Sequence, residues 1–196
     1  MVMAMKNVSI YWDNSNIFVP AQDVARAHDG ATVGRDLRIQ FDTIYELARA
    51  NRKVVSGVCV GSLPPELDAL WARLRDVGVE LELFERGEES GQEQAVDQAL
   101  QVHMLRAIVD LEPGIAVLLT GDGAGALEGR GFFADLKRMH SKGWAIEVIS
   151  WRNSCHSKLR AWAEENGRFI ALDDFYESVT FIKGLRKAKP LPRKLR

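Results

Sequence analysis

Three aspartates in this sequence stand where their neighbours suggest a chemical use for a carboxylate. Asp13 ends the stretch Asn7 to Asn16, in which the β-branched and aromatic residues from Val8 to Trp12 are typical of a buried strand. In an open parallel sheet, ligands bind just beyond the carboxyl ends of the strands, so an acid at this point is a candidate functional residue. The alternative is an Asp that ends the strand or caps the following turn.

Asp97 is the second of these acids, and it lies in a predicted long helix. It shares one helical stripe with Leu100, Met104 and Ile108, which follow it by three, seven and eleven residues. A carboxylate on a face otherwise given to the core is unfavourable unless a partner satisfies it. The alternative is that the apolar stripe only begins here, with Asp97 at its solvated edge.

Asp122 is the third acid, and it follows the strand Ile115–Leu119 within the glycine-rich turn that begins Thr120-Gly121. The strand is apolar at every position, which indicates burial on both faces and therefore a parallel sheet. Asp122 is then expected at the same edge of the sheet as Asp13. An Asp that serves only the geometry of the turn is the alternative.

Three carboxylates at one edge of a sheet would repel one another and raise each other's pKa. A hard divalent cation such as Mg²⁺ or Mn²⁺ removes that penalty, because it prefers oxygen ligands. Such an ion can activate water and stabilise the charge that develops on a phosphodiester. We expect the polar residues beside the acids to orient them or to hold substrate oxygens, although they could also form a simple polar turn: Asn14, Ser15, Asn16 and Thr120.

Predicted strands and helices alternate along the chain, which indicates a doubly wound α/β fold: three layers, α/β/α, around a mainly parallel sheet. We expect strands at about residues 8–12, 53–60, 79–84, 115–119, 144–150 and 169–172, and helices at about 36–50, 66–77, 92–110, 132–141 and 154–165. Residues 20–35 are expected to be irregular and ordered only by a ligand or partner. We expect one domain over residues 1–182 and a flexible basic tail over residues 183–196.

Composition sets limits on the class of protein. The chain has 196 residues, of which 46% are hydrophobic and 27% charged, as in an ordinary soluble globular protein. Two cysteines, Cys59 and Cys155, are too few for a disulfide framework or a zinc site. No apolar run has the length of a membrane span and no secretory signal precedes the first strand, so we expect a cytoplasmic protein without a membrane partner.

Three short motifs, in order, resemble the NYN domain, the PIN-like nuclease family that includes the bacterial LabA-like proteins. The motifs are Ile10 to Asn16, Ala95 to Leu100 and Leu118 to Gly123. Later segments, from Gly143 to Ser150, Ser154 to Leu159 and Phe169 to Asp174, are similar to the closing half of that family. The similarity covers most of the chain, from about residue 7 to about residue 176.

This resemblance implies a PIN-like fold and metal-dependent cleavage of RNA, with single-stranded RNA as the expected substrate. Residue by residue, Asp13, Asp97 and Asp122 match the family's acidic metal-site positions, and Asn16 matches the Asn of its first motif. The chain departs from the family at Ala124, where members commonly carry a second acid. Three acids could substitute for it, or could be ordinary surface charges: Glu93, Glu128 and Asp135.

Parts of the sequence also fit functions other than a nuclease. Gly121 to Ala126 also fits a dinucleotide-binding pattern with Glu147 downstream, but Asp122 would place a negative charge beside the pyrophosphate. An aspartyl-phosphate phosphatase would need an acid where Ser15 stands. The stronger alternative is a non-catalytic RNA-binding or regulatory adaptor on the same fold, with a degenerate metal site.

RNA contacts are expected from two further parts of the chain. Trp151 and Arg152 follow a strand whose carboxyl end should face the site, so they could stack on and pair with a nucleotide, although Trp151 could equally belong to the core. The basic tail would suit phosphate contacts. His103 is interpreted as a core or boundary residue, and the other histidines lack metal-ligand spacing. A homodimer is compatible with the sequence.

Overall fold

A computed structural model describes residues 7–62, 72, 74–76, 78–84, 91–123 and 129–192, of which residues 62, 83–84 and 91–97 are described by their backbone alone. Six strands form the central sheet in the order β4-β3-β1-β5-β6-β7, and every neighbouring pair is parallel. The strands are β1 Val8–Asp13, β3 Val54–Ser62, β4 Glu80–Phe84, β5 Ile115–Leu119, β6 Ala145–Ser150 and β7 Arg168–Ala171.

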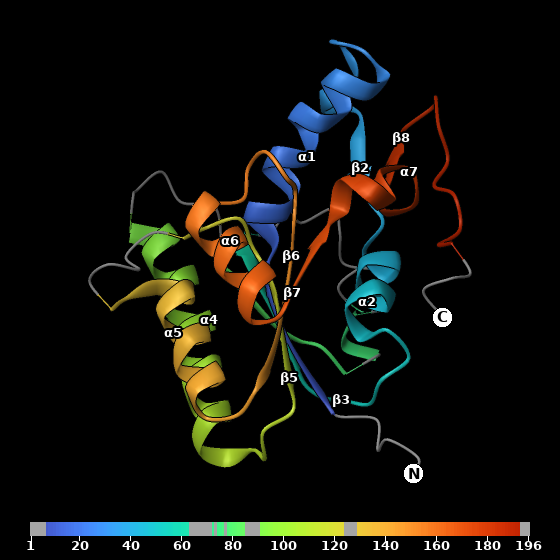
Figure 1. Ribbon diagram of the computed structural model, residues 1–196. Coiled ribbons are helices and arrows are strands. Elements are labelled where there is room, and N and C mark those ends of the chain that lie inside the picture. The colour runs from blue at the N-terminus through green and yellow to red at the C-terminus, as the bar shows by residue number, and fades with distance from the viewer. Residues whose placement is uncertain are drawn as a thin grey trace.

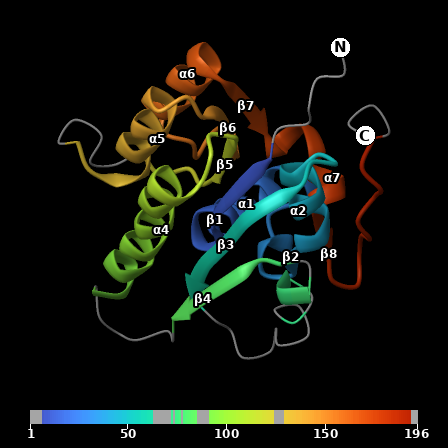
Figure 2. The ribbon, with the colours of Figure 1, turned by 90° about the horizontal axis from the view of Figure 1, so that it is seen from below.

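Helices cover both faces of this sheet (Figures 1 and 2). One face carries α1 Asn14–Asp29, α2 Phe41–Arg49 and α7 Tyr176–Val179, and the other carries α4 Gly91–Asp110, α5 Gly131–Ser141 and α6 Ser157–Asn166. The two faces follow from alternation along β1, because Ile10 and Trp12 pack into the first core and Tyr11 into the second. The expected α/β fold, with a mainly parallel sheet and helices on both sides, is confirmed.

A second sheet of two strands, β2 Leu37–Ile39 and β8 Thr180–Ile182, lies at the far end of α1. The pairing is antiparallel, with Leu37 opposite Ile182 and Ile39 opposite Thr180, and all four residues are buried. This small sheet joins two segments that are distant in sequence, and no sequence pattern predicted it.

The prediction that residues 20–35 are irregular is wrong for most of that segment. Helix α1 continues through Pro20 to Asp29, and a 3-10 turn over Val33–Arg35 follows. Proline inside a helix costs about 3 kcal/mol. Burial of Ile17, Ala21 and Ala25, which share one face at a spacing of four residues, offsets that cost. Tertiary packing therefore outweighs the local preference.

The expected helix over residues 36–50 begins late, because its first part pairs as strand β2 and α2 starts at Phe41. Of the expected helix over residues 66–77, residues 72 and 74–76 are helical and the others lie outside the described residues. After β7, a 3-10 turn over Leu172–Phe175 leads into the four-residue α7.

The basic segment after residue 182 packs against the domain as far as the structure describes it. The Arg186 guanidinium donates to the Asp29 carboxylate at 3.1 Å, to the Thr180 carbonyl at 3.0 Å and to Thr180 Oγ1 at 2.8 Å. It also lies 4.8 Å above the Tyr176 ring, and Lys189 pairs with Glu177 at 2.7 Å. This differs from the flexible tail expected from composition, because composition does not reveal these partners. Residues 193–196 lie outside the described residues.

Replacement of Arg186 tests whether this packing stabilises the fold. Arg186→Ala removes charge-assisted hydrogen bonds to Asp29 and Thr180, so we expect the free energy of unfolding to fall by about 2 kcal/mol. Urea unfolding measures the change. The matched control is Lys187→Ala, because Lys187 is exposed and has no ion pair with the described residues. Equal stability of the two variants would contradict the prediction.

Candidate functional site

Asp13 lies at the junction of β1 and α1, with no loop between the two elements. It is the last residue of the strand and the N-cap of the helix, where its Oδ1 accepts the backbone N–H of Asn16 at 3.1 Å. The Asn16 side-chain amide donates to the other carboxylate oxygen. Both partners favour the ionised carboxylate. The polar residues after Asp13 therefore begin a helix, and Asn16 fixes the orientation of the Asp13 carboxylate.

The Asp13 carboxylate is almost completely buried, with 1% of the residue exposed. Burial raises the pKa of Asp13, the hydrogen bonds from Asn16 oppose that rise, and the negative charge of Asp122 adds to it. Asp13 and Asp122 are therefore close enough to interact electrostatically. A positive charge between the two carboxylates would offset both the free-energy cost of burying Asp13 and the repulsion between the acids.

Thr120 links these two acids. β1 and β5 are neighbours in the sheet, and Trp12 is opposite Leu119. Asp13 and Thr120 are the next residue of each segment, so they lie beside one another at the edge of the sheet. The Thr120 hydroxyl donates to Asp13 Oδ2 at 3.5 Å and accepts the Asp122 backbone N–H at 3.1 Å. Because Thr120 is fully buried, it contacts the acids and not solvent. Asp122 itself is half-buried.

Asn14 adds a buried acceptor to the same edge. Its side chain packs against Gly61 of β3, where an added Cβ would lie only 3.0 Å from Asn14 Cβ. Asn14 Oδ1 is buried and has no hydrogen-bond partner among the residues that the structure describes. Ser15 is exposed, and its backbone N–H helps to hold Asp13. Carboxylate, amide and hydroxyl oxygens are the ligands that a hard cation prefers, so this donor set fits one.

Asp97 belongs to α4, but its side chain lies outside the described residues. Leu100 and Met104, three and seven residues later, are fully buried in the core between the sheet and α4. The apolar stripe predicted for this helix is therefore the face that meets the sheet. Whether the Asp97 carboxylate reaches Asp13 and Asp122 stays a prediction. The side chain of Glu93 and all of Ala124 and Glu128 are also outside the described residues.

Asp135 of α5 is a buried acid, with 1% of the residue exposed. Its Oδ1 accepts from Arg138 at 2.6 Å, whereas Oδ2 has no hydrogen-bond partner among the described residues. Burial raises the pKa of Asp135, and Arg138 partly opposes the rise. Arg138 also donates to the Gly129 carbonyl at 2.6 Å, which ties the residue two positions before α5 to this helix. Asp135 is thus not the solvated surface charge that the sequence allowed.

A second group of potential metal ligands lies on the α4 side of the sheet. Glu80, Glu82 and His103 place one ligand atom each within 4.8 Å of one another, and His103 Nε2 lies 2.7 Å from Glu82 Oε1. Glu82 is opposite Val60, which is opposite Asp13, so Glu82 shares the row and the face of Asp13 two strands away. The acidic character of this edge therefore extends beyond β1 and β5.

The predicted role of Trp151 in stacking on a base is wrong, because its indole is fully buried and donates to the Ile17 carbonyl at 2.8 Å. It packs α1 against the sheet. Arg152 is exposed, and its guanidinium donates to both oxygens of Asp174 at 2.6 Å. The Arg152 guanidinium, which was expected to pair with a nucleotide, is therefore engaged in an ion pair within the protein.

His156 lies at this edge although its spacing in the sequence did not suggest it. Its backbone N–H donates to the Gly121 carbonyl at 2.9 Å, and its ring packs so closely on Gly123 that an added Cβ there would lie 2.6 Å from Cγ. Gly123 is therefore required for the approach of the segment before α6 to Asp122. The sequence signal was Gly123, which was interpreted as part of a turn and of two motifs but not as a contact for a histidine ring.

Comparison with known proteins assigns the chain to a family and shows a shared fold. The NYN domain profile matches residues 7–173, which is most of the chain. The chain belongs to the NYN domain family. A crystal structure of a protein of unknown function from Vibrio parahaemolyticus shares the fold, with 17% sequence identity and a TM-score of 0.60 over 89% of this chain and 97% of that chain. No match was found among the curated proteins.

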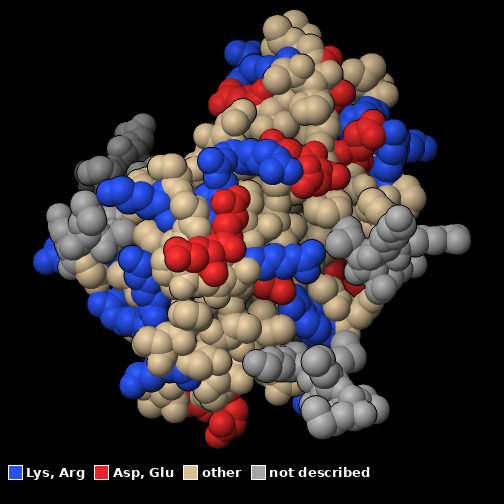
Figure 3. Space-filling view, in the orientation of Figure 1, with Lys and Arg blue, Asp and Glu red and all other residues tan. Residues whose placement is uncertain are grey.

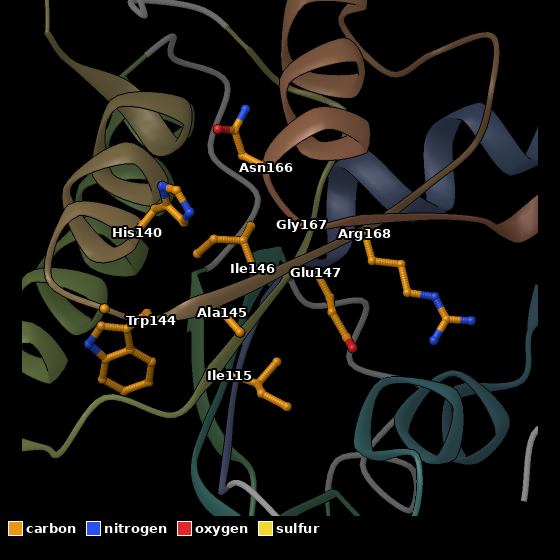
Figure 4. Close-up of a pocket in the computed structure, with 10 residues that line it drawn as sticks. Ile115, His140, Trp144, Ala145, Ile146, Glu147, Asn166, Gly167 and Arg168 are labelled. Carbon is orange, nitrogen blue, oxygen red and sulfur yellow. The ribbon is translucent and has the colours of Figure 1, made fainter.

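The dinucleotide-binding alternative is not supported in this NYN domain. Glu147, its proposed ribose ligand, lies toward the amino edge of the sheet, where Arg52 donates to both carboxylate oxygens at 2.8 and 2.7 Å. Figure 4 shows the pocket at that edge, with Glu147 and Arg168 beside it. Asp13 is the last residue of β1 and Asp122 follows β5, so both lie at the carboxyl edge of the sheet, away from Glu147. No described helix is both long and apolar enough to cross a membrane.

The buried charge of Asp13 predicts how stability depends on pH when metal is absent. Because the pKa of Asp13 is higher in the folded than in the unfolded protein, the folded state binds more protons between the two values. The free energy of unfolding should therefore fall as pH rises through that window. Asp13→Asn keeps an N-cap acceptor without the charge, so its melting temperature should fall less than that of the wild type over the same rise in pH.

Thermal unfolding in EDTA, from about pH 4 to pH 8, measures this difference between the wild type and Asp13→Asn. Asp110→Asn, at the exposed end of α4, is the matched control and should follow the wild type. Parallel pH profiles for Asp13→Asn and the wild type would show that Asp13 carries no buried charge.

Proposed function

We propose that this NYN domain is a divalent-metal-dependent endoribonuclease that hydrolyses RNA phosphodiesters at the carboxyl edge of its sheet. The observation that carries the proposal is the buried Asp13 carboxylate, whose pKa is raised by burial and by Asp122. Hydrogen bonds from Asn16 and Thr120 compensate the buried carboxylate only in part, and a bound cation would offset the remaining cost of burial beside a second acid. Membership of the NYN family supports a nuclease.

Mg²⁺ or Mn²⁺ fits the oxygen donors, with Asp13, Asp97 and Asp122 as the proposed ligands and Asn14 Oδ1 as a further acceptor beside them. When bound, the ion supplies a water of lowered pKa and stabilises charge on the phosphate. The residues around the site hold its geometry. Asn16 holds the Asp13 carboxylate, and Thr120 connects Asp13 with the backbone of Asp122.

Single-stranded RNA is the proposed substrate. Asp13 is recessed, so a flexible strand can bring a phosphate to it more easily than a rigid duplex can. Ser15, exposed in the first turn of α1, is the proposed contact for phosphate oxygens, together with the N-terminal end of that helix.

An RNA-binding adaptor without catalysis is the second candidate, because Ala124 replaces an acid that the family commonly carries. Asp135 is a described candidate for that missing charge, since one of its buried carboxylate oxygens has no partner among the described residues. Loss of cleavage in Asp135→Asn, without loss of fold, would separate a catalytic from a purely structural role.

Substitution of the two described acids tests the nuclease. Asp13→Asn and Asp122→Asn should each lower Mn²⁺-dependent cleavage of a single-stranded RNA by at least about a hundredfold, since each removes a negative ligand. Asp110→Asn is the control and should cleave at the wild-type rate. Gel analysis of an end-labelled RNA gives the rates, and circular dichroism checks the fold. Full cleavage by both site variants would refute this assignment, and RNA binding without cleavage under any metal would favour the adaptor.

Metal binding can be measured without cleavage. Mn²⁺ at about 100 times its dissociation constant should stabilise the wild type by about 2.7 kcal/mol, because the ion binds the folded state alone. Asp13→Asn should show little of this stabilisation. Thermal unfolding with and without Mn²⁺ measures it, and an anomalous difference map of a soaked crystal locates the ion. An ion held by Glu80, Glu82 and His103 alone would contradict the proposed ligands.

A further inference from the structure

The outer face of the small β2–β8 sheet pairs an arginine with an aromatic ring. Arg38 is directly opposite Phe181 in the antiparallel register, whereas the residues before and after each of them are buried. Alternation therefore places Arg38 and Phe181 side by side on the outer face, where both are partly exposed. The Arg38 guanidinium is steadied by the Arg35 carbonyl at 2.9 Å and the Leu37 carbonyl at 2.7 Å.

Cations without acidic partners surround this pair. Arg35, Lys183 and Lys187 are exposed and form no ion pair with the described residues. Arg186 and Lys189, in contrast, pair with Asp29 and Glu177 and hold the segment in place. Figure 3 shows basic side chains at the upper right, over β8, with acidic side chains beside them. Two lysines of this segment are therefore free to meet a negatively charged partner.

A groove of about 620 Å³ runs along the same segment. Phe181 and Leu185 provide apolar surface in it, Gln40 a polar group, and Lys183 and Lys187 positive charge. Leu185 is 68% exposed. Apolar and aromatic surface next to lysines fits a single nucleic-acid strand, in which bases stack and phosphates meet cations.

Helix α1 connects this groove with the candidate active site. The helix is capped by Asp13 and ends at Asp29, which binds Arg186. Its 16 residues span roughly 24 Å at about 1.5 Å per residue. In Figure 1, α1 extends beyond the carboxyl edge of the central sheet and the small sheet lies beside its distal half. An RNA strand at Asp13 would need several further nucleotides to reach the groove.

We propose that the outer face of the β2–β8 sheet, with the groove of residues 181–188, is a second binding site for single-stranded RNA. It holds the substrate at a distance from the cleaved bond, and this role rests on the proposed function. A strand long enough to span α1 uses both sites, whereas a very short one reaches the aspartates alone.

The test uses the full chain, with binding measured in EDTA by fluorescence anisotropy of a labelled RNA of about 20 nucleotides. Lys183→Gln with Lys187→Gln should lower affinity at least about tenfold at low salt. It should reduce the slope of log affinity against log salt by about 1.4, since each contact with a single strand contributes about 0.7. Phe181→Leu should lower affinity at least about fivefold with an unchanged salt slope.

The matched control is Lys53→Gln with Lys142→Gln, which removes the same charge at the opposite edge of the sheet and should bind like the wild type. In Mn²⁺, the variants should cleave an RNA of about 3 nucleotides at the wild-type rate and the long RNA more slowly at low concentration. Circular dichroism confirms folding.

Unchanged long-RNA affinity in both groove variants would overturn the proposal, as would an equal loss in the control. The proposal would also be overturned, in favour of a lipid surface, if the groove variants lost binding to anionic phosphatidylserine vesicles but kept the RNA affinity of the wild type. Because binding in EDTA requires no catalysis, a wild type that never cleaves RNA would refute the nuclease while leaving the groove to be judged by its binding data.

Discussion

The burial of one carboxylate, that of Asp13, constrains the rest of the site. β1 passes into α1 without a loop, so the acid is both the end of a central strand and the cap of a helix. Its negative charge is held by Asn16 and Thr120 and is opposed by low solvent access and by Asp122. A bound cation, as proposed, would stabilise this arrangement, because hydrogen bonds alone compensate only part of the lost hydration.

The two faces of the sheet differ in the residues that they place around this carboxylate. The α4 face carries acids, since Asp13 and Glu82 share a row on it, and Leu100 and Met104 of α4 pack against it. The α1 face is held by Trp151, whose indole N–H reaches the Ile17 carbonyl through the core. Packing beneath α1 holds the helix cap, and with it the Asp13 carboxylate, in position.

The distal end of α1 links the site to the C-terminal segment. The Asp29 carboxylate accepts hydrogen bonds from the Tyr176 hydroxyl at 2.7 Å and from Arg186 Nε at 3.1 Å. The chain after β8 is therefore fixed to the same helix that Asp13 caps. Substrate bound by the small sheet would therefore lie at a set distance from the aspartates. A rigid helix keeps that distance constant, whereas a flexible tail would not.

The strands, the two-sided sheet and the candidate acids Asp13 and Asp122 could be predicted from the sequence, because alternation and apolar runs are local properties of the chain. The course of α1 through Pro20, the pairing of β2 with β8 and the burial of Trp151 could not, since each depends on contacts between distant residues. The same holds for the partners of Arg186 and for the contact of His156 with Gly123. Local patterns reveal which residues prefer the interior, but packing energy decides which of them meet.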